Sequence, residues 1–330
     1  MLKKNIILSL VMIATLLMSL LAGCGSNNSA NQSSEKGKKS VVCTIFPEYD
    51  WAKEVIGDLD DSYELTLLLD NGVDLHSYQP TAEDIAKIYT ADLFIYVGGE
   101  SDDWVEDALK EATNKDMQVI NLLEVLGDSI KEEEVVEGME AEEEHEHEEE
   151  KPEYDEHVWL SLKNSQVLVE AIADSLAIVD TEHADELQQN ATTYNEKLDA
   201  LDKEYEQAVA GGNKNTILFG DRFPFRYMVD DYNLDYYAAF VGCSAETEAS
   251  FETIVFLAGK VDELGLSNIF IIENSDQKIA TTISENTADK NQQILTMDSM
   301  QSTTSKDIEA GKTYLSIMES NLDVLKTALQ

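Results

Sequence analysis

Apolar positions from residue 41 onward follow two alternating rhythms. Short apolar runs typical of buried strands lie at 41–46, 63–69, 92–99 and 117–122. Segments with the three-to-four-residue spacing of helices follow the first three runs, at 49–57, 81–91 and 102–113. A chain that alternates strand with helix predicts a mainly parallel sheet with helices on both of its faces.

The same alternation returns in the second half of the chain. Strands are expected at 215–221, 235–241, 268–273 and 293–298, and helices at 250–265 and 276–287. Between the two series, apolar residues recur every three or four positions from Leu187 to Tyr205, which predicts one long amphipathic helix ending near a glycine pair at 211–212. We therefore expect an α/β protein with two open, mainly parallel lobes, 41–180 and 213–330, joined by a helix over 181–212.

The N-terminus reads as an export signal. A short basic start, "MLKKN", precedes an almost wholly apolar run, which by length alone could also span a membrane. The run ends in "LAGC", residues 21–24, which resembles the lipobox of bacterial lipoproteins. That resemblance implies cleavage after residue 23, a lipid on Cys24 that anchors the chain to the membrane, and a flexible tether over 24–40.

The charge excludes one class of partner. The chain carries 66 Asp and Glu against 23 Lys and Arg, a net charge of −43, whereas nucleic-acid binding needs a basic surface. Such acidity suits cationic partners, or simply keeps an exported chain soluble. The segment 131–156 holds fifteen acidic residues together with His145 and His147, and we expect it to be disordered. Either its histidines hold metal weakly as an accessory site, or it is a solvated acidic loop.

The two remaining cysteines leave a choice open. Export permits a disulfide between Cys43 and Cys243. Since Cys43 lies in the apolar run "VVCTIF", two buried free cysteines are an equal alternative.

Four side chains suited to metal binding lie at the ends of predicted strands or in loops. They are His76, His157, Asp221 and Glu273. Ligands of parallel α/β sheets bind beyond the carboxyl ends of strands. A single histidine is usually structural and a carboxylate at a strand end is ordinary, but the four together favour a metal site in a cleft between the lobes.

Two of these residues lie in longer motifs. "GVDLHSYQPTAEDI" (72–85) resembles the first-ligand loop GxDPHxYEPTPxD, and "DEHVWLSLKN" (155–164) resembles the second-ligand motif DPHVWLDPxN. Together with "NATTYNEKLDALDKEY" and "AETEAS", they make the chain, from residue 41 to its end, resemble the zinc and manganese substrate-binding lipoproteins of ABC transporters.

The resemblance implies a function and a site. It implies two lobes linked by a rigid helix, His76 and His157 as metal ligands, and Glu273 as a third or fourth ligand. It places the acidic loop where the family has a histidine-rich loop. The expected cargo is zinc, with manganese as the alternative, delivered to an ABC transporter permease at the extracytoplasmic face of the membrane. We expect a monomer and no enzymatic activity.

One position departs from the family pattern. In "GDRFPFRYM", Arg222 falls where the family has its third ligand, and a protonated guanidinium cannot bind a cation. Asp221 is the nearest substitute and Cys243 a remoter one; alternatively, Asp221 caps the following helix. We expect Arg222 to turn away from the ion and pair with an acidic residue.

Two other function classes were weighed. A metal-dependent hydrolase would need a general base beside an open coordination position, and the sequence contains no HExxH, nucleophile elbow or glycine-rich phosphate loop. A metal-dependent adhesin-type lipoprotein is the remaining alternative.

Overall fold

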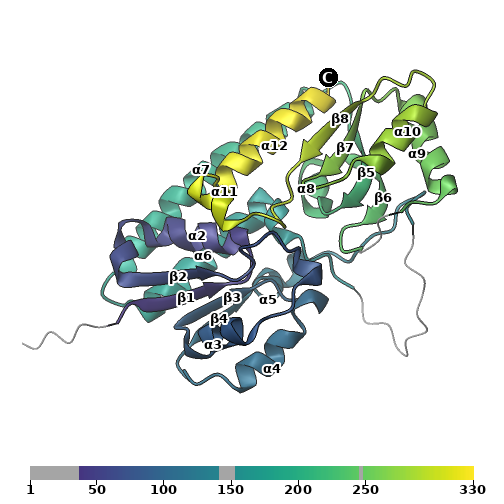
Figure 1. The fold of residues 1–330 in the computed structure, drawn as a ribbon. Coiled ribbons are helices and arrows are strands. Elements are labelled where there is room, and N and C mark those ends of the chain that lie inside the picture. Colours follow the sequence, from purple (N-terminus) through teal and green to yellow (C-terminus); the bar gives the residue numbers. More distant parts are fainter. Residues whose placement is uncertain (1–36, 141–152, 245–247) are drawn as a thin grey trace, which may run out of the picture. The chain divides into compact units, whose positions relative to one another are not determined.

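The first half of the chain builds a parallel four-stranded sheet. The computed structural model describes residues 37–140, 153–244 and 248–330 (Figure 1), within which Lys38–Gln330 form one compact unit. The strands of this sheet are β1 Lys39–Cys43, β2 Tyr63–Leu67, β3 Leu93–Tyr96 and β4 Gln118–Asn121, in the order β2-β1-β3-β4. All of its pairings are parallel, as the alternation of strand and helix predicts.

The second half repeats this topology. Its strands are β5 Thr216–Phe223, β6 Asp235–Val241, β7 Asn268–Ile272 and β8 Gln293–Met297, in the order β6-β5-β7-β8 and all parallel. In each sheet the first strand of the series lies between the second and the third, so the direction of winding reverses there. Ligands of such sheets bind at this reversal, beyond the carboxyl ends of the strands. The prediction of two parallel α/β lobes is confirmed.

Helices accompany both sheets. In the first half they are α2 Phe46–Ile56, α3 Ala82–Thr90, α4 Trp104–Lys110, α5 Leu122–Leu126 and α6 Leu162–Val179. In the second half they are α8 Arg226–Tyr232, α9 Phe251–Leu264, α10 Lys278–Asn286, α11 Ser305–Glu309 and α12 Tyr314–Ala328. The spacing of apolar residues did not predict α5, α6, α11 or α12.

The long helix is α7, Ala184–Ala210. Its buried side chains include all six that the apolar spacing singled out: Leu187, Ala191, Tyr194, Leu198, Leu201 and Tyr205. This stripe packs against α6 and α2 from the first half of the chain and against α12 and α8 from the second (Figure 1). Helix α7 therefore contributes to the packing of both halves.

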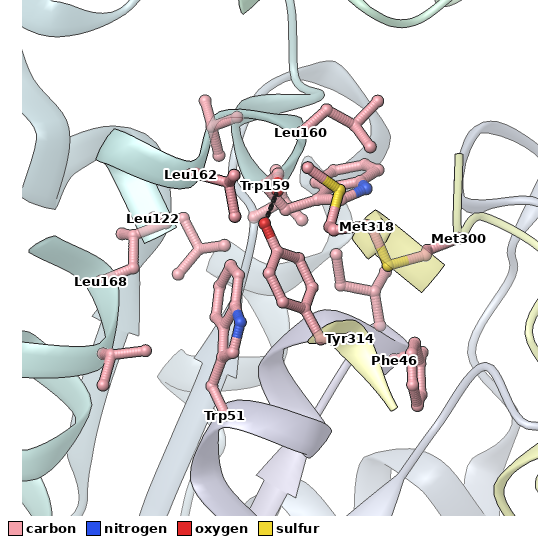
Figure 2. Close-up of a cluster of buried hydrophobic side chains, with 14 of the residues drawn as sticks. Phe46, Trp51, Leu122, Trp159, Leu160, Leu162, Leu168, Met300, Tyr314 and Met318 are labelled. Atoms are coloured by element: carbon pink, nitrogen blue, oxygen red, sulfur yellow. Dashed lines mark hydrogen bonds between the residues drawn. The ribbon is translucent and has the colours of Figure 1, made fainter. Parts of the chain in front are cut away.

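Aromatic side chains tie the C-terminal helix to the first half of the chain (Figure 2). The rings of Trp51 and Tyr314 meet edge to face with centroids 5.1 Å apart. The Tyr314 hydroxyl donates to the Trp159 carbonyl at 2.7 Å and lies 2.8 Å from Ser165 Oγ. The indole of Trp159 in turn donates to the carbonyl of Ser299 at 2.8 Å. These buried contacts fix the segment around residue 157 against α12 and against the loop after β8.

The stems of the acidic segment are ordered, which corrects the expectation of disorder over all of 131–156. The Glu133 N–H donates to the Glu153 carbonyl and the Glu140 N–H to the Ala239 carbonyl, both at 2.9 Å. Glu134 pairs with Arg226 at 3.3 Å. The first bond joins the two stems to each other, and the other two contacts join a stem to strand β6 and helix α8. Composition alone does not reveal such pairing. The segment's two histidines, His145 and His147, lie outside the described residues.

The two cysteines that the structure describes are both free. Cys43 is fully buried in β1, and Cys243 follows β6 and is partly exposed. This settles the choice in favour of free thiols. Cys24 and the expected export signal and lipid anchor lie outside the described residues. Within the described residues, no helix is both long and apolar enough to cross a membrane.

Replacing Tyr314 with phenylalanine tests the link to the C-terminal helix. The change removes one hydroxyl and leaves the buried Trp159 carbonyl without this donor, so we expect a loss of about 1–3 kcal/mol in the free energy of unfolding. Chemical denaturation measures it, with Tyr154→Phe at a position 39% exposed as the control, where we expect a change within about 0.5 kcal/mol. Equal stability of the two variants would contradict the role of this hydroxyl.

Candidate metal centre

His76 is held in a short turn after β2. It lies in a single 3₁₀ turn, Leu75–Ser77, whose N-cap is Asp74. The Asp74 carboxylate accepts the backbone N–H of His76 at 3.1 Å, as N-cap side chains commonly do. The imidazole is 11% exposed and points into the protein, where its Nδ1 lies 2.8 Å from Ser101 Oγ and 3.5 Å from the Glu156 carboxylate.

His157 is fully buried at the start of another 3₁₀ turn, Val158–Leu160. A single oxygen of Asp155 accepts both its backbone N–H, at 2.8 Å, and its Nδ1, at 2.9 Å. The ring of Trp159 packs against it with centroids 5.2 Å apart. Backbone, side-chain and ring contacts therefore all restrict the orientation of this imidazole.

The two imidazoles converge on one point. His76 Nε2 and His157 Nε2 lie 3.1 Å apart. Each Nδ1 faces an oxygen partner, so both Nε2 atoms are available to a shared ion, and without an ion a proton on one Nε2 can be donated to the other. Two nitrogens bound to one tetrahedral zinc ion at its usual bond length lie about 3.3 Å apart. The observed separation is therefore close to the one that a shared ion requires.

The surrounding charges act on the two rings in opposite directions. Burial, and then the neighbouring His157, lowers the pKa of His76 to about 3, so this imidazole is neutral, the form that binds metal. Burial also acts to lower the pKa of His157, but the adjacent carboxylates of Asp155 and Glu156 outweigh it and raise that pKa. Burial raises the pKa of Glu156. The centre thus combines two nitrogen donors with nearby carboxylates that favour a bound cation.

A third donor reaches the pair from the second half of the chain. Among the described residues, His76, His157 and Cys243 form a group whose candidate ligand atoms all lie within 4.8 Å of one another. Cys243 comes just after β6, and its neighbour Gly242 lies against the His157 ring. A Cβ on Gly242 would meet ring atoms of His157 at 2.9 Å and 3.0 Å, so the absence of a side chain allows this close approach.

The two predicted carboxylate ligands line a neighbouring cavity instead. Asp221 and Glu273, together with Asp74 and Arg222, border a cavity of about 450 Å³. Glu273 accepts from the backbone and hydroxyl of Ser299 at 2.7 Å and 2.9 Å, and from the Gln301 N–H at 3.1 Å. The structure therefore brings His76 and His157 together without bringing Asp221 or Glu273 into their group.

Asp221 does not cap a helix. It lies inside strand β5, at an irregularity in the pairing with β6 between Phe219 and Arg222, and helix α8 begins only at Arg226. One of its oxygens accepts the Arg222 N–H at 2.9 Å, and the other is buried with no hydrogen-bond partner in the described residues. The alternative of a helix cap is therefore wrong.

Arg222 pairs with an acidic residue, as expected from the sequence. Its guanidinium donates to the Asp74 carboxylate at 2.7 Å and to the Ser244 carbonyl at 3.3 Å. Burial acts to raise the pKa of Asp74, but Arg222 outweighs it and holds that pKa below its usual range. The arginine thus connects the turn that carries His76 to the loop that carries Cys243.

The residues that orient the two histidines and Cys243 were not predicted from the sequence. Asp155 was quoted only as part of a motif, although its place two residues before His157 is the signal that could have found it. Ser101 carries no such signal, because β3 brings it to His76 from 25 positions along the chain. Glu133 was counted only as part of the acidic segment, yet its carboxylate accepts the Cys243 N–H at 3.2 Å.

Comparison with known proteins agrees with this geometry. The family model described as the periplasmic component A of the zinc-uptake complex (ZnuA) matches residues 41–328. The zinc-binding lipoprotein AdcA of Streptococcus pneumoniae serotype 4 is 32% identical over 319 residues, which cover 96% of this chain and 60% of AdcA. The high-affinity zinc uptake system protein ZnuA of Bacillus subtilis is 29% identical over 314 residues, 94% of each chain.

A solved structure supports the same assignment. The Zn(II)-bound ZnuA-like domain of Streptococcus pneumoniae AdcA matches with a TM-score of 0.69 and 30% identity, over 89% of this chain and 99% of that domain. The chain spans 57% to 60% of the length of its AdcA relatives. The match to the family model over 41–328 nevertheless covers most of the chain, and the chain belongs to the ZnuA family.

Proposed function

We propose that this protein captures zinc outside the cytoplasm and delivers it to the permease of an ABC transporter. The observation that carries the proposal is the 3.1 Å separation of His76 Nε2 and His157 Nε2, with each Nδ1 facing oxygen partners. Relatives named zinc-binding and zinc-uptake proteins support it. A site of this kind binds and releases its ion, so we propose a solute-binding protein and not an enzyme.

Zinc suits the donors better than manganese. Imidazole is a good ligand for zinc, whereas manganese favours carboxylate, carbonyl and water oxygens. The group at the centre offers two imidazoles and a thiol, while the predicted carboxylates Asp221 and Glu273 line the adjacent cavity. We propose manganese only as a weaker competitor.

The remaining assignments concern placement in the cell. We propose that Cys24 carries a lipid that holds the protein at the extracytoplasmic face of the membrane, with 24–40 as a tether. A zinc-binding lipoprotein among the relatives supports this. The net charge of −43 would raise the local concentration of cations at low ionic strength.

Alanine at either ligand histidine tests the site. His76→Ala and His157→Ala each remove a direct ligand, so we expect zinc affinity to fall by well over tenfold, which is more than about 1.4 kcal/mol. His183→Ala is the matched control, because His183 lies at the start of α7 and pairs with Asp180 at 2.9 Å. Isothermal calorimetry measures all three, and wild-type affinity in either ligand variant would refute the assignment.

Two nested deletions test the acidic segment. Removing 141–152, with His145 and His147, should leave the tight zinc dissociation constant within about twofold and reduce the number of weakly bound ions. Removing 132–153 also deletes Glu133, which contacts Cys243, and Glu140, which pairs with β6, so tight binding should weaken. Equilibrium dialysis counts the ions. Loss of the tight site in the shorter deletion would show that the loop itself supplies a ligand.

A further inference from the structure

We propose that the Cys243 thiolate is the third protein ligand, so that this chain binds its ion through two nitrogens and one sulfur. The inference rests on the proposed function, because it names a ligand and a selectivity for the same site. The Cys243 sulfur then serves as the third ligand, the role that the sequence analysis gave to the carboxylate of Asp221. The class of ion that such a set prefers is a thiophilic divalent metal, which favours zinc over manganese.

The first support is position. Cys243 Sγ belongs to the group whose ligand atoms lie within 4.8 Å of one another, while sulfur and nitrogen on one tetrahedral zinc ion lie about 3.6 Å apart. Closing that difference requires only a small movement of a side chain on a loop. The loop is free to approach because Gly242 has no Cβ to meet the His157 ring.

The second support is the substitution of an arginine at position 222. A guanidinium cannot be a ligand, and this one is fixed elsewhere, by Asp74 at 2.7 Å and the Ser244 carbonyl at 3.3 Å. Asp74 is two residues from His76, and Ser244 directly follows Cys243. Arg222 is therefore not a ligand. It links the turn that carries His76 to the loop that carries Cys243, the two segments that supply the ligands.

The third support is the environment of the thiol. The Glu133 carboxylate accepts the Cys243 N–H at 3.2 Å and so restricts the backbone beside the thiol. Outer carboxylates that hold a ligand in place are common at metal sites. Glu133 is thus a positioning residue, and it links the stem of the acidic segment to the ion.

Metal binding exchanges the proton on the Cys243 sulfur for the metal ion. The S–H bond of Cys243 breaks as the sulfur–metal bond forms, the sulfur keeps the electron pair, and the proton leaves to solvent. No oxidant or reductant takes part. The thiolate adds one negative charge to two neutral imidazoles, which leaves room for water or a carboxylate as the fourth ligand.

Optical spectra of metal-loaded protein test the inference directly. Cobalt and cadmium serve as probes of the full chain, because a thiolate bound to either gives a charge-transfer absorption that imidazole and carboxylate do not. We expect this absorption in the wild type, its loss in Cys243→Ser, and its retention in Cys43→Ala, whose thiol is fully buried in β1. Asp221→Asn, which removes the competing charged ligand, should also retain it.

Affinities complete the test. Cys243→Ser should lower zinc affinity by more than tenfold and manganese affinity by less, so the zinc-to-manganese ratio should fall. Glu133→Gln should weaken zinc binding less than Cys243→Ser and keep the thiolate absorption, as a positioning residue would. Thermal melting of the metal-free variants separates loss of a ligand from loss of fold.

The outcomes distinguish the two proposals. A wild type that binds zinc tightly but shows no thiolate absorption overturns the assignment of Cys243 and leaves the zinc-binding function intact. Unchanged absorption in Cys243→Ser overturns the assignment of Cys243 as well. So does a loss of tight zinc binding in Asp221→Asn when Cys243→Ser still binds zinc tightly. A wild type that binds no zinc overturns the proposed function itself. If Cys243→Ser fails to fold, thiolate absorption that persists in a Cys24→Ser/Cys43→Ala variant assigns it to Cys243, and its loss there overturns the proposal.

Discussion

The fixed orientation of two buried imidazoles is the constraint on which the rest of the site depends. The carboxylate of Asp155 holds His157 by both its ring and its backbone, and Ser101 faces the outer nitrogen of His76. With each outer nitrogen facing an oxygen, the two inner nitrogens lie 3.1 Å apart, close to the spacing that a shared zinc ion requires. Zinc binding to such a pair costs little reorganisation, because the ring orientations are already set.

The repeated topology explains how residues so distant in sequence come together. In both sheets the winding reverses at the first strand of the series, and loops at the carboxyl ends of the strands supply the side chains. His76 follows β2, Cys243 follows β6, and Arg222 lies near the end of β5. The ion pair of Arg222 with Asp74 then joins a loop of the first sheet to a strand of the second.

Prediction from sequence succeeded where a local pattern carries the information. The strand–helix alternation repeats over many residues, so the fold was predicted; the two histidines lie in motifs, and their role as metal ligands stays a prediction. Asp221 and Glu273 were chosen because carboxylates at strand ends converge, but their distance from the histidines depends on the local irregularity in β5 and on the hydrogen bonds that Ser299 and Gln301 donate to Glu273. Neither the irregularity in β5 nor these hydrogen bonds can be predicted from the spacing of residues in the sequence.

The stems of the acidic segment were out of reach for the same reason, and Cys243 was named only as a remoter substitute for the third ligand. The composition of an acidic run predicts that it is solvated. Glu140 nevertheless pairs with β6 through its backbone, and backbone pairing cannot be predicted from charge. Cys243 is brought to the histidines by a glycine that tolerates close contact, and one glycine among sixteen is no signal by itself.

Anomalous diffraction from crystals of the zinc-loaded protein, collected on both sides of the zinc absorption edge, locates the bound ion. We expect one strong zinc peak between His76 Nε2 and His157 Nε2, at about 2.0–2.1 Å from each nitrogen. A zinc peak elsewhere, with the two imidazoles still hydrogen-bonded to each other, would contradict it.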